Sequence, residues 1–157
     1  MLFRSVIYDA TAPSTTISAP VVAVKQTASS YTVQWQATDA VAKFGGSNDW
    51  DLQRQVAAAA NGMCGIFAND ATVGSLVSGA SELAQSQSQT GLAHAKCYRW
   101  TLAATDQNGN AATLDVSPSV LIDTTAPVPD FVTPDEGSTV TNGTTSYVVA
   151  WGDSDPE

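Results

Sequence analysis

Seven oxygen-bearing side chains stand near turns or near a repeated phrase, and their chemistry suits a cation site. They are Asp9, Asp39, Asp106, Asn108, Asn110, Asp123 and Asp155. Carboxylate and amide oxygens are hard ligands of the kind that calcium takes in proteins. Asp and Asn are also favoured in turns for reasons that need no ion. The sequence therefore leaves two interpretations open, a calcium site and plain turn chemistry.

Catalytic chemistry has few candidates in this chain. His94 is the single histidine, and no neighbouring serine or carboxylate forms a recognisable motif with it. Glutamate occurs only at Glu82, Glu136 and Glu157, so the paired carboxylates of glycoside hydrolysis are scarce. The sequence contains no phosphate loop, dinucleotide fingerprint or zinc-hydrolase helix. We therefore expect no enzyme and no required cofactor, with calcium as the one optional ion.

The charge balance excludes several classes of partner. The 157-residue chain has a formal charge of −9 and six Lys and Arg together. Nucleic-acid binding needs clustered cations, so nucleic acid is excluded, and anionic membranes are disfavoured in the same way. No stretch approaches the roughly 18 apolar residues of a membrane span, so membrane insertion is not expected. With 13% charged residues and much Thr, Ser, Ala, Val and Gly, the composition favours a secreted β-rich protein.

One phrase occurs twice and indicates how the chain is organised. Residues 5–13 (SVIYDATAP) are answered by 119–127 (SVLIDTTAP), which places the two aspartates 114 positions apart. Residues 30–35 (SYTVQW) are answered by 146–151 (SYVVAW) at a spacing of 116. A fixed period of this kind predicts a tandem array. We interpret the chain as part of a longer protein.

The repeated phrase divides the chain into five expected parts. Residues 1–8 are the last strand of a preceding repeat, and 9–13 are a linker. A complete repeat follows over 14–122. A second linker covers 123–127, and 128–157 begin a following, truncated repeat.

Alternation of apolar and polar residues predicts the strands of the complete repeat. Residues 31–36, 50–56 and 98–104 alternate in this way. The Asn-Gly turn in 106–110 predicts that 98–104 form a hairpin with the apolar positions of 114–122.

Other segments are less clearly patterned. Residues 15–18 and 21–24 predict an interrupted edge strand with Pro20 at the break. Residues 51–61 have helical propensity, but the preceding alternation and Asn61-Gly62 favour a strand that ends in a loop. The run 86–89 is polar enough for a solvated strand edge or a loop.

A family resemblance follows from these segments. Leu92, Tyr98 and residues 100–110 (WTLAATDQNGN) resemble the sixth strand and following turn of bacterial fibronectin type III and related Ig-like repeats. Residues 31–35 resemble the second strand of that family, and 123–127 resemble its inter-repeat linker. The resemblance implies an all-β, antiparallel two-sheet β-sandwich, with Tyr98 as the tyrosine-corner residue and Trp35 in the core.

The middle of the repeat exceeds what such a fold requires. Residues 57–89 contain four consecutive alanines, several glycines and a Ser/Gln run. They predict an enlarged loop region. Such a region is either an ordinary long loop or the place of a binding surface.

The two cysteines, Cys64 and Cys97, are 33 residues apart. Their even number in a secreted composition predicts one disulfide bond, with two free thiols in a reducing compartment as the alternative. A single histidine and the absence of a C-x-x-C pair argue against zinc. If Tyr98 and Trp100 face the core, Cys97 faces outward with Arg99. The disulfide would then tie the middle region to this strand.

The resemblance also implies where the cation ligands would meet. In such sandwiches the second-to-third and sixth-to-seventh loops lie at the pole that the preceding linker enters. The residues expected at this first junction are Asp9, Asp39, Asp106, Asn108 and Asn110. At the next junction Asp123 would meet Asp155. Similar acidic junctions in some bacterial Ig-like and cadherin-like arrays bind calcium and stiffen the rod.

The expected function is that of a non-catalytic, extracellular structural or adhesion repeat, acting as a spacer in a long bacterial surface or secreted protein. Its partners would be neighbouring repeats and a cell-surface glycan or protein. The alternative is an accessory carbohydrate-binding module of a secreted enzyme, which would stack exposed aromatic rings on sugars. Because Trp35, Trp50 and Trp100 fall on inward positions, core packing is favoured for them.

Overall fold

The computed structural model describes residues 8–41, 43–45, 49–73, 75–133, 139 and 149–154. The chain divides into two units, Met1–Thr124 and Thr125–Glu157, and each is described by itself. The strand expected over 1–8 lies outside the described residues apart from Tyr8. Among the described residues no helix is long and apolar enough to cross a membrane.

The first unit is all-β in the part of the chain that is described. Its strands in chain order are β1 (Ser14–Ala19), β2 (Val24–Gln26), β3 (Ser30–Thr38), β4 (Trp50–Ala60), β5 (Met63–Cys64), β6 (Ala68–Asn69), β7 (Ser75–Gly79), β8 (Gln85–Thr90), β9 (Lys96–Ala104), β10 (Asp115–Val116) and β11 (Val120–Ile122).

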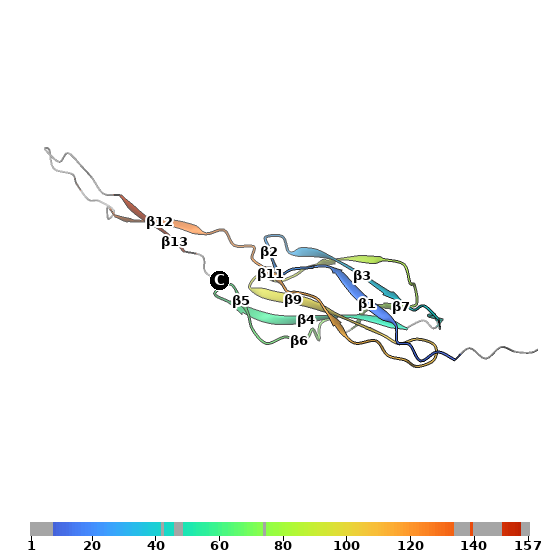
Figure 1. The fold of residues 1–157 in the computed structure, drawn as a ribbon. Helices are drawn as coiled ribbons and strands as arrows, with labels where there is room; N and C mark the ends of the chain where they lie inside the picture. The colour runs from blue at the N-terminus through green and yellow to red at the C-terminus, as the bar shows by residue number, and fades with distance from the viewer. Residues whose placement is uncertain are drawn as a thin grey trace, which may run out of the picture. The chain divides into compact units, whose positions relative to one another are not determined.

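These strands form two sheets that lie as two layers (Figure 1). The smaller sheet has the order β1-β3-β8, with antiparallel pairing throughout. The larger sheet has the order β2-β11-β9-β4-β5, with β10 also on β9, and β6 and β7 also on β4. Its pairs are antiparallel except β2 with β11, which is parallel. The expectation of an all-β fold with two sheets is confirmed.

The core lies between the two sheets because strand alternation directs large apolar side chains inward. Val33 is fully buried, and the exposed fractions of Trp35, Trp50 and Trp100 are 3%, 3% and 0%. The rings of Trp35 and Trp50 meet edge to face with centroids 5.8 Å apart, and Tyr31 stacks on Trp100 at 5.7 Å. The predicted inward positions of these three tryptophans are confirmed.

The first edge strand is interrupted at Pro20, as expected, but its second half begins later than predicted. β1 ends at Ala19 and pairs with β3, whereas β2 begins only at Val24 and pairs with β11. The side chains of Val21 and Val22 are exposed between the two strands. The break therefore moves the chain from one sheet to the other.

The middle region contains strands where a loop was expected. β4 extends to Ala60 because nine of its residues pair with β9, which outweighs the helical propensity of its alanines. The opposite edge of β4 carries further backbone hydrogen-bonding groups, and β5, β6 and β7 pair with that edge. The Ser/Gln run forms β8, the edge strand of the smaller sheet.

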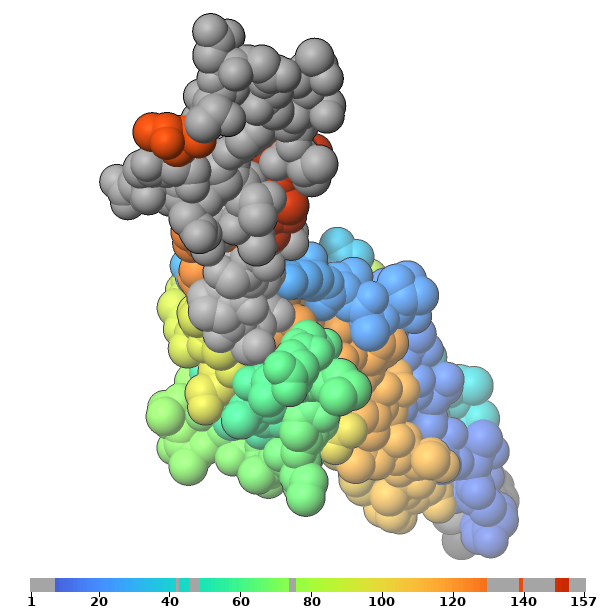
Figure 2. Space-filling model, turned by 90° about the vertical axis from the view of Figure 1, so that its left-hand side faces the viewer, coloured from blue at the N-terminus to red at the C-terminus, as the bar shows by residue number. Residues whose placement is uncertain are grey.

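A disulfide bond fixes the middle region on the outer side of the larger sheet. Cys64 of β5 is bonded to Cys97 of β9, and their Cα atoms are 5.7 Å apart. Cys97 is fully buried there beside Ala57 and Leu121, and Phe67 packs over this small cluster. Figure 2 shows the green segment that contains β5 beside orange surface. Cys64 of β5 lines a hollow of about 210 Å³ together with residues of β2 and β11. The predicted disulfide, and the strand to which it ties the middle region, are confirmed.

Arg54 occupies an inward position of β4 and has its own buried partners. Its side chain is 10% exposed and contacts Asp70 with N–O distances of 2.7 and 2.9 Å. The guanidinium also lies 5.2 Å from the ring centre of Tyr98. Burial raises the pKa of the Asp70 carboxyl, but hydrogen bonds from Thr72 and Arg54 and the charge of Arg54 outweigh it and lower that pKa.

The second unit contains an antiparallel pair of strands, β12 (Val128–Thr133) and β13 (Ala150–Ser154). Phe131 lies opposite Trp151, and the register shifts between Phe131 and Thr133. In the first unit Ile17 lies opposite Trp35, with a register shift between Ile17 and Ala19. The two strand pairs therefore share their register and their irregularity, although Trp151 is 74% exposed and Trp35 is buried.

Candidate metal centre

Three aspartates meet at the pole of the first unit where its first strand begins. Asp9 precedes β1, Asp39 follows β3, and Asp106 follows β9. One carboxylate oxygen from each lies within 4.8 Å of the other two. The exposed fractions of the residues are 9%, 3% and 5%. The structure thus brings together three of the seven predicted ligands.

The spacing of these oxygens fits a single calcium ion. Calcium binds oxygen at roughly 2.3–2.6 Å, so two ligands of one ion lie at most about 4.6–5.2 Å apart. The three aspartate oxygens lie within 4.8 Å of one another, so one ion can contact all three. Calcium accepts six to eight oxygen ligands, and water can complete a set that protein begins.

The two carboxylate oxygens of Asp9 differ in their hydrogen bonding. Oδ1 accepts the backbone N–H of Thr11 at 2.8 Å, and the Asp9 carbonyl accepts the amide of Asn110 at 3.1 Å. Oδ2 is buried and accepts no hydrogen bond from the described residues. A buried carboxylate oxygen without a donor is costly, so a cation ligand would compensate for it.

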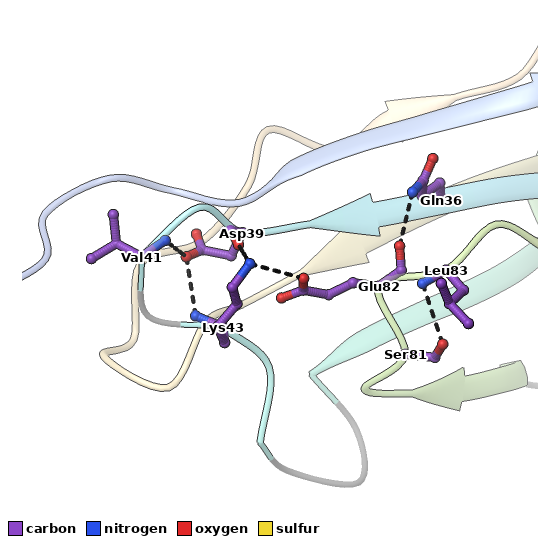
Figure 3. A network of polar contacts seen from close by, with 7 residues as sticks. All are labelled: Gln36, Asp39, Val41, Lys43, Ser81, Glu82 and Leu83. Atoms are coloured by element: carbon purple, nitrogen blue, oxygen red, sulfur yellow. Dashed lines mark hydrogen bonds and ion pairs between the residues drawn. The ribbon is translucent and has the colours of Figure 1, made fainter.

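Asp39 is held by the loop that follows β3 (Figure 3). Its Oδ1 accepts the backbone N–H groups of Val41 at 2.8 Å and Lys43 at 3.1 Å. The Lys43 ammonium donates to the Asp39 carbonyl at 2.7 Å and pairs with Glu82 at 3.1 Å. The Glu82 carbonyl in turn accepts the side-chain amide of Gln36 at 2.8 Å. The loop therefore fixes the carboxylate of Asp39 through Oδ1.

Asp106 is held by the turn that follows β9. Its Oδ1 accepts the backbone N–H groups of Asn108 and Asn110, each at 2.8 Å, and its Oδ2 accepts the Asn110 side-chain amide at 2.8 Å. Burial raises the pKa of the Asp106 carboxyl, but these hydrogen bonds, with one from Gly109, outweigh it and lower that pKa. Asp106 is therefore ionised at neutral pH.

The two predicted asparagine ligands have other roles. Asn108 is exposed and contributes its backbone N–H to Asp106. Asn110 donates its side-chain N–H groups to the Asp9 carbonyl and to Asp106, so it joins the segment before β1 to the turn after β9. Sequence reasoning did not find Lys43 and Glu82, whose contact spans 39 residues and has no local signal.

The second predicted junction is not assembled in the described residues. Asp123 follows β11, whose last residue Ile122 pairs with Lys96 at the start of β9. Asp106 follows the end of β9, so the nine residues of that strand, about 30 Å, separate the two aspartates. Asp123 pairs with Lys25 at 2.8 Å. Asp155 lies outside the described residues, so its meeting with Asp123 stays a prediction.

The cluster offers a divalent cation three carboxylates at one point. Three negative charges this close repel one another, and a divalent cation would offset that repulsion. The backbone N–H groups of the loops are directed at the Oδ1 atoms and hold the carboxylates in place. No protein-family model, curated protein or solved structure matches the chain, so the fold and these residues carry the functional argument.

Proposed function

We propose that this chain is a non-catalytic β-sandwich repeat of the fibronectin type III or Ig-like class, acting as a spacer or adhesion module in an extracellular array. We further propose that calcium binds Asp9, Asp39 and Asp106 and clamps the incoming linker. The observation that carries the proposal is the burial of the linker residue Asp9 against two loops of the sandwich that follows it.

The strand pairing supports the sandwich class. β3 lies between β1 and β8 in one sheet, and β9 lies between β4 and the β10–β11 segment in the other, as in Ig-like Greek keys. The Tyr98 hydroxyl accepts the backbone N–H of Ala93 at 3.0 Å, which is the contact of a tyrosine corner. The matching strand pairs β1–β3 and β12–β13 support a tandem arrangement.

An extracellular location is supported by the disulfide and by the charge. Disulfide bonds persist in oxidising compartments and are rare in the cytosol. The Cys64–Cys97 bond fixes an element that has a small core of its own on the sheet exterior. A formal charge of −9 helps to keep a repetitive β-protein dispersed.

The proposed mechanism is mechanical. Asp9 belongs to the linker, whereas Asp39 and Asp106 belong to the sandwich, so an ion shared by the three resists rotation of the linker against the sandwich. Pro13 is buried directly before β1 and restricts the same segment. Loss of the ion would leave three close carboxylates that repel, so the linker would loosen.

Calorimetric titration of the chelator-treated chain with calcium tests the proposal. We expect heat of binding and a rise in melting temperature, since an ion at 100 times its dissociation constant stabilises the folded state by about 2.7 kcal/mol. Asp9→Asn should remove most of this rise, and Asp123→Asn, the same residue of the other linker, should keep it. Absence of both heat and shift, or a full shift in Asp9→Asn, would overturn the calcium clamp.

The alternative, a carbohydrate-binding module, has less support. The tryptophans of the first unit are buried in its core and present no ring for stacking on a sugar. Trp151 is exposed, but its register in the β12–β13 pair matches that of the buried Trp35 in the β1–β3 pair. Glycan-array binding that is lost on Trp151→Ala, with the fold of the first unit retained, would favour this alternative over the spacer.

A further inference from the structure

The two edges of the smaller sheet differ in how well they are protected. Edge strands usually carry a bulge, a proline or a charge that prevents pairing with another chain. β1 has a register shift between Ile17 and Ala19 and is followed directly by Pro20. Its Ile17 N–H donates to the Asp115 carboxylate at 2.6 Å, so this edge is also occupied by a side chain.

The other edge, β8, has none of these devices. Gln85–Thr90 (QSQSQT) contains no charged residue and no proline. It pairs with β3 in one uninterrupted register, from Trp35 opposite Gln85 to Ser30 opposite Thr90. Among the described strands, β3 is its single partner. β8 therefore presents a straight, uncharged edge of six residues.

The direction of the backbone groups of β8 follows from the pairing on the far side of β3. The Ile17 N–H points away from β3, since it donates to Asp115, so Ile17 and Trp35 form a non-hydrogen-bonded pair. Trp35 must then direct its own N–H and C=O toward Gln85. Alternate residues of β8 bond to β3, and the remaining ones direct both groups outward. The outward set is Ser86, Ser88 and Thr90.

The sequence of this edge is the same in both directions. Residues 85–89 read Gln-Ser-Gln-Ser-Gln, so an antiparallel pairing of two copies centred on Gln87 places residues of the same type opposite each other. A two-fold axis through Gln87 places Ser86 opposite the partner's Ser88, and Ser88 opposite the partner's Ser86. These serines carry the outward backbone groups, so the two pairs would form four N–H to O=C hydrogen bonds.

Gln87 supplies a second observation at the position of that axis. Its side-chain carbonyl oxygen Oε1 is buried and has no hydrogen-bond partner among the described residues. In the paired arrangement Gln87 would lie directly opposite the partner's Gln87. A glutamine amide both donates and accepts, so two of them across a two-fold axis satisfy one another.

We propose that β8 is a self-association edge, which pairs antiparallel with β8 of a second copy of this chain. The pairing joins two three-stranded sheets into one six-stranded sheet across the two-fold axis. Ser86 and Ser88 are exposed, so no side chain has to move out of the core. This inference does not depend on calcium, because the residues of β8 are separate from Asp9, Asp39 and Asp106. In an array it would connect chains side by side.

Sedimentation equilibrium of the full chain over a concentration series tests the pairing. We expect a monomer–dimer equilibrium with a dissociation constant on the order of 100 µM, since few side chains are buried. The double variant S86K/S88K places lysines opposite lysines and should weaken the dimer at least about tenfold. T16K adds a charge to the exposed face of the protected edge β1 and should leave the dimer unchanged.

A charge-complementation experiment separates pairing from simple loss of structure. S86D/S88D should also be monomeric alone, but a mixture of the aspartate and lysine double variants should form a heterodimer, because opposite charges then face each other. S88P removes an N–H that points away from β3, so it should keep the far-ultraviolet circular dichroism of the folded chain and lose the dimer. A chain that stays monomeric to about 1 mM, or a dimer insensitive to S88P, would overturn the proposal.

Discussion

The two copies of the repeated phrase place the same aspartate in opposite electrostatic surroundings. Asp9 is 9% exposed and lies against two further carboxylates, those of Asp39 and Asp106. Asp123 is 4% exposed and pairs with the ammonium of Lys25 at 2.8 Å. The phrase alone therefore does not decide what its aspartate does. Residues distant in the sequence decide it.

Under the proposed function, the two copies show the two sides of one kind of junction. Asp123 is held by the repeat that the chain leaves, through Lys25 and through its own N–H, which donates to the Gln26 carbonyl at 2.9 Å. Asp9 is held by the repeat that the chain enters, through the amide of Asn110. A linker aspartate in an array would have both sets of neighbours. The neighbours of Asp9 include two further carboxylates, whereas those of Asp123 include a lysine. A cation beside Asp9 would therefore balance an excess of negative charge that is absent around Asp123.

The largest expected effect is on the response to calcium. Asp39→Asn should reduce the stabilisation by calcium from about 2.7 kcal/mol, at 100 times the dissociation constant, to below about 1 kcal/mol. The reason is that the variant replaces one of three charged ligands by a neutral amide, which keeps the hydrogen bonds to Val41 and Lys43. Urea unfolding with calcium and with chelator measures the difference. If the response of Asp39→Asn to calcium is undiminished, the carboxylates around Asp9 do not bind the ion, and the proposed contrast with Asp123 is wrong.

The next effect is a difference of sign in the absence of calcium. Asp9→Asn should raise the free energy of unfolding by about 1 kcal/mol, because it relieves repulsion among carboxylates. Asp123→Asn should lower it by about 1 kcal/mol, because it removes the partner of Lys25, whose side chain is 49% exposed and partly screened by solvent. Urea unfolding in chelator at low salt measures both. If both variants change the free energy of unfolding in the same direction, the surroundings of Asp9 and Asp123 are electrostatically alike.

The sequence predicted the acidic pole because its members stand beside readable strands. Asp39 and Asp106 follow the alternating segments β3 and β9, and Asp9 precedes the first edge strand. In a sandwich the ends of such strands share a pole, so their flanking residues meet. The same alternation placed Cys97 on the outer side of β9, opposite to Tyr98. Strand ends and strand parity are local properties, which explains why a single sequence contains them.

The partners of Asp123 and Arg54 and the short strands of the middle region could not be predicted, because they depend on pairing between segments distant in the sequence. Lys25 reaches Asp123 through the parallel pairing of β2 with β11, two strands of three residues each that are almost 100 residues apart. β5 and β6 have two residues each, too few for a periodic signal, and are strands because the edge of β4 is available. Arg54 stands at an inward position of the alternating pattern. The position of its partner Asp70, in contrast, is not indicated by any alternation of apolar and polar residues.

The pH dependence gives a smaller test of the acidic pole. The pKa of Asp106 is lowered in the folded state, so its ionised form stabilises the fold above its unfolded pKa of about 3.9. This contribution is lost as the pH falls below about 4 and through the folded pKa. Asp106→Asn should therefore reduce stability at neutral pH and flatten the dependence below pH 4. Urea midpoints from pH 6 to pH 2.5 measure it, and an unchanged slope would contradict the role of the turn.

The smallest effects distinguish the two lysines. Lys25→Gln should lower the free energy of unfolding by less than about 1 kcal/mol, an effect that decreases with salt, and should leave calcium affinity unchanged. Lys43→Gln removes a positive charge beside Asp39. It should tighten calcium binding about threefold, because a unit charge roughly 6 Å from a divalent ion contributes about 1.4 kcal/mol in water and physiological salt screens about half of it.

Calorimetric titration of the two lysine variants at one ionic strength makes the comparison direct. Both variants lose one positive charge, so a general effect of net charge would change their calcium affinities equally. A local effect would change only that of Lys43→Gln, because Lys25 pairs with Asp123 at the opposite end of β9 from Asp106. Equal changes would mean that the acidic pole responds to the total charge of the chain, and the distinction between Asp9 and Asp123 would lose its electrostatic basis.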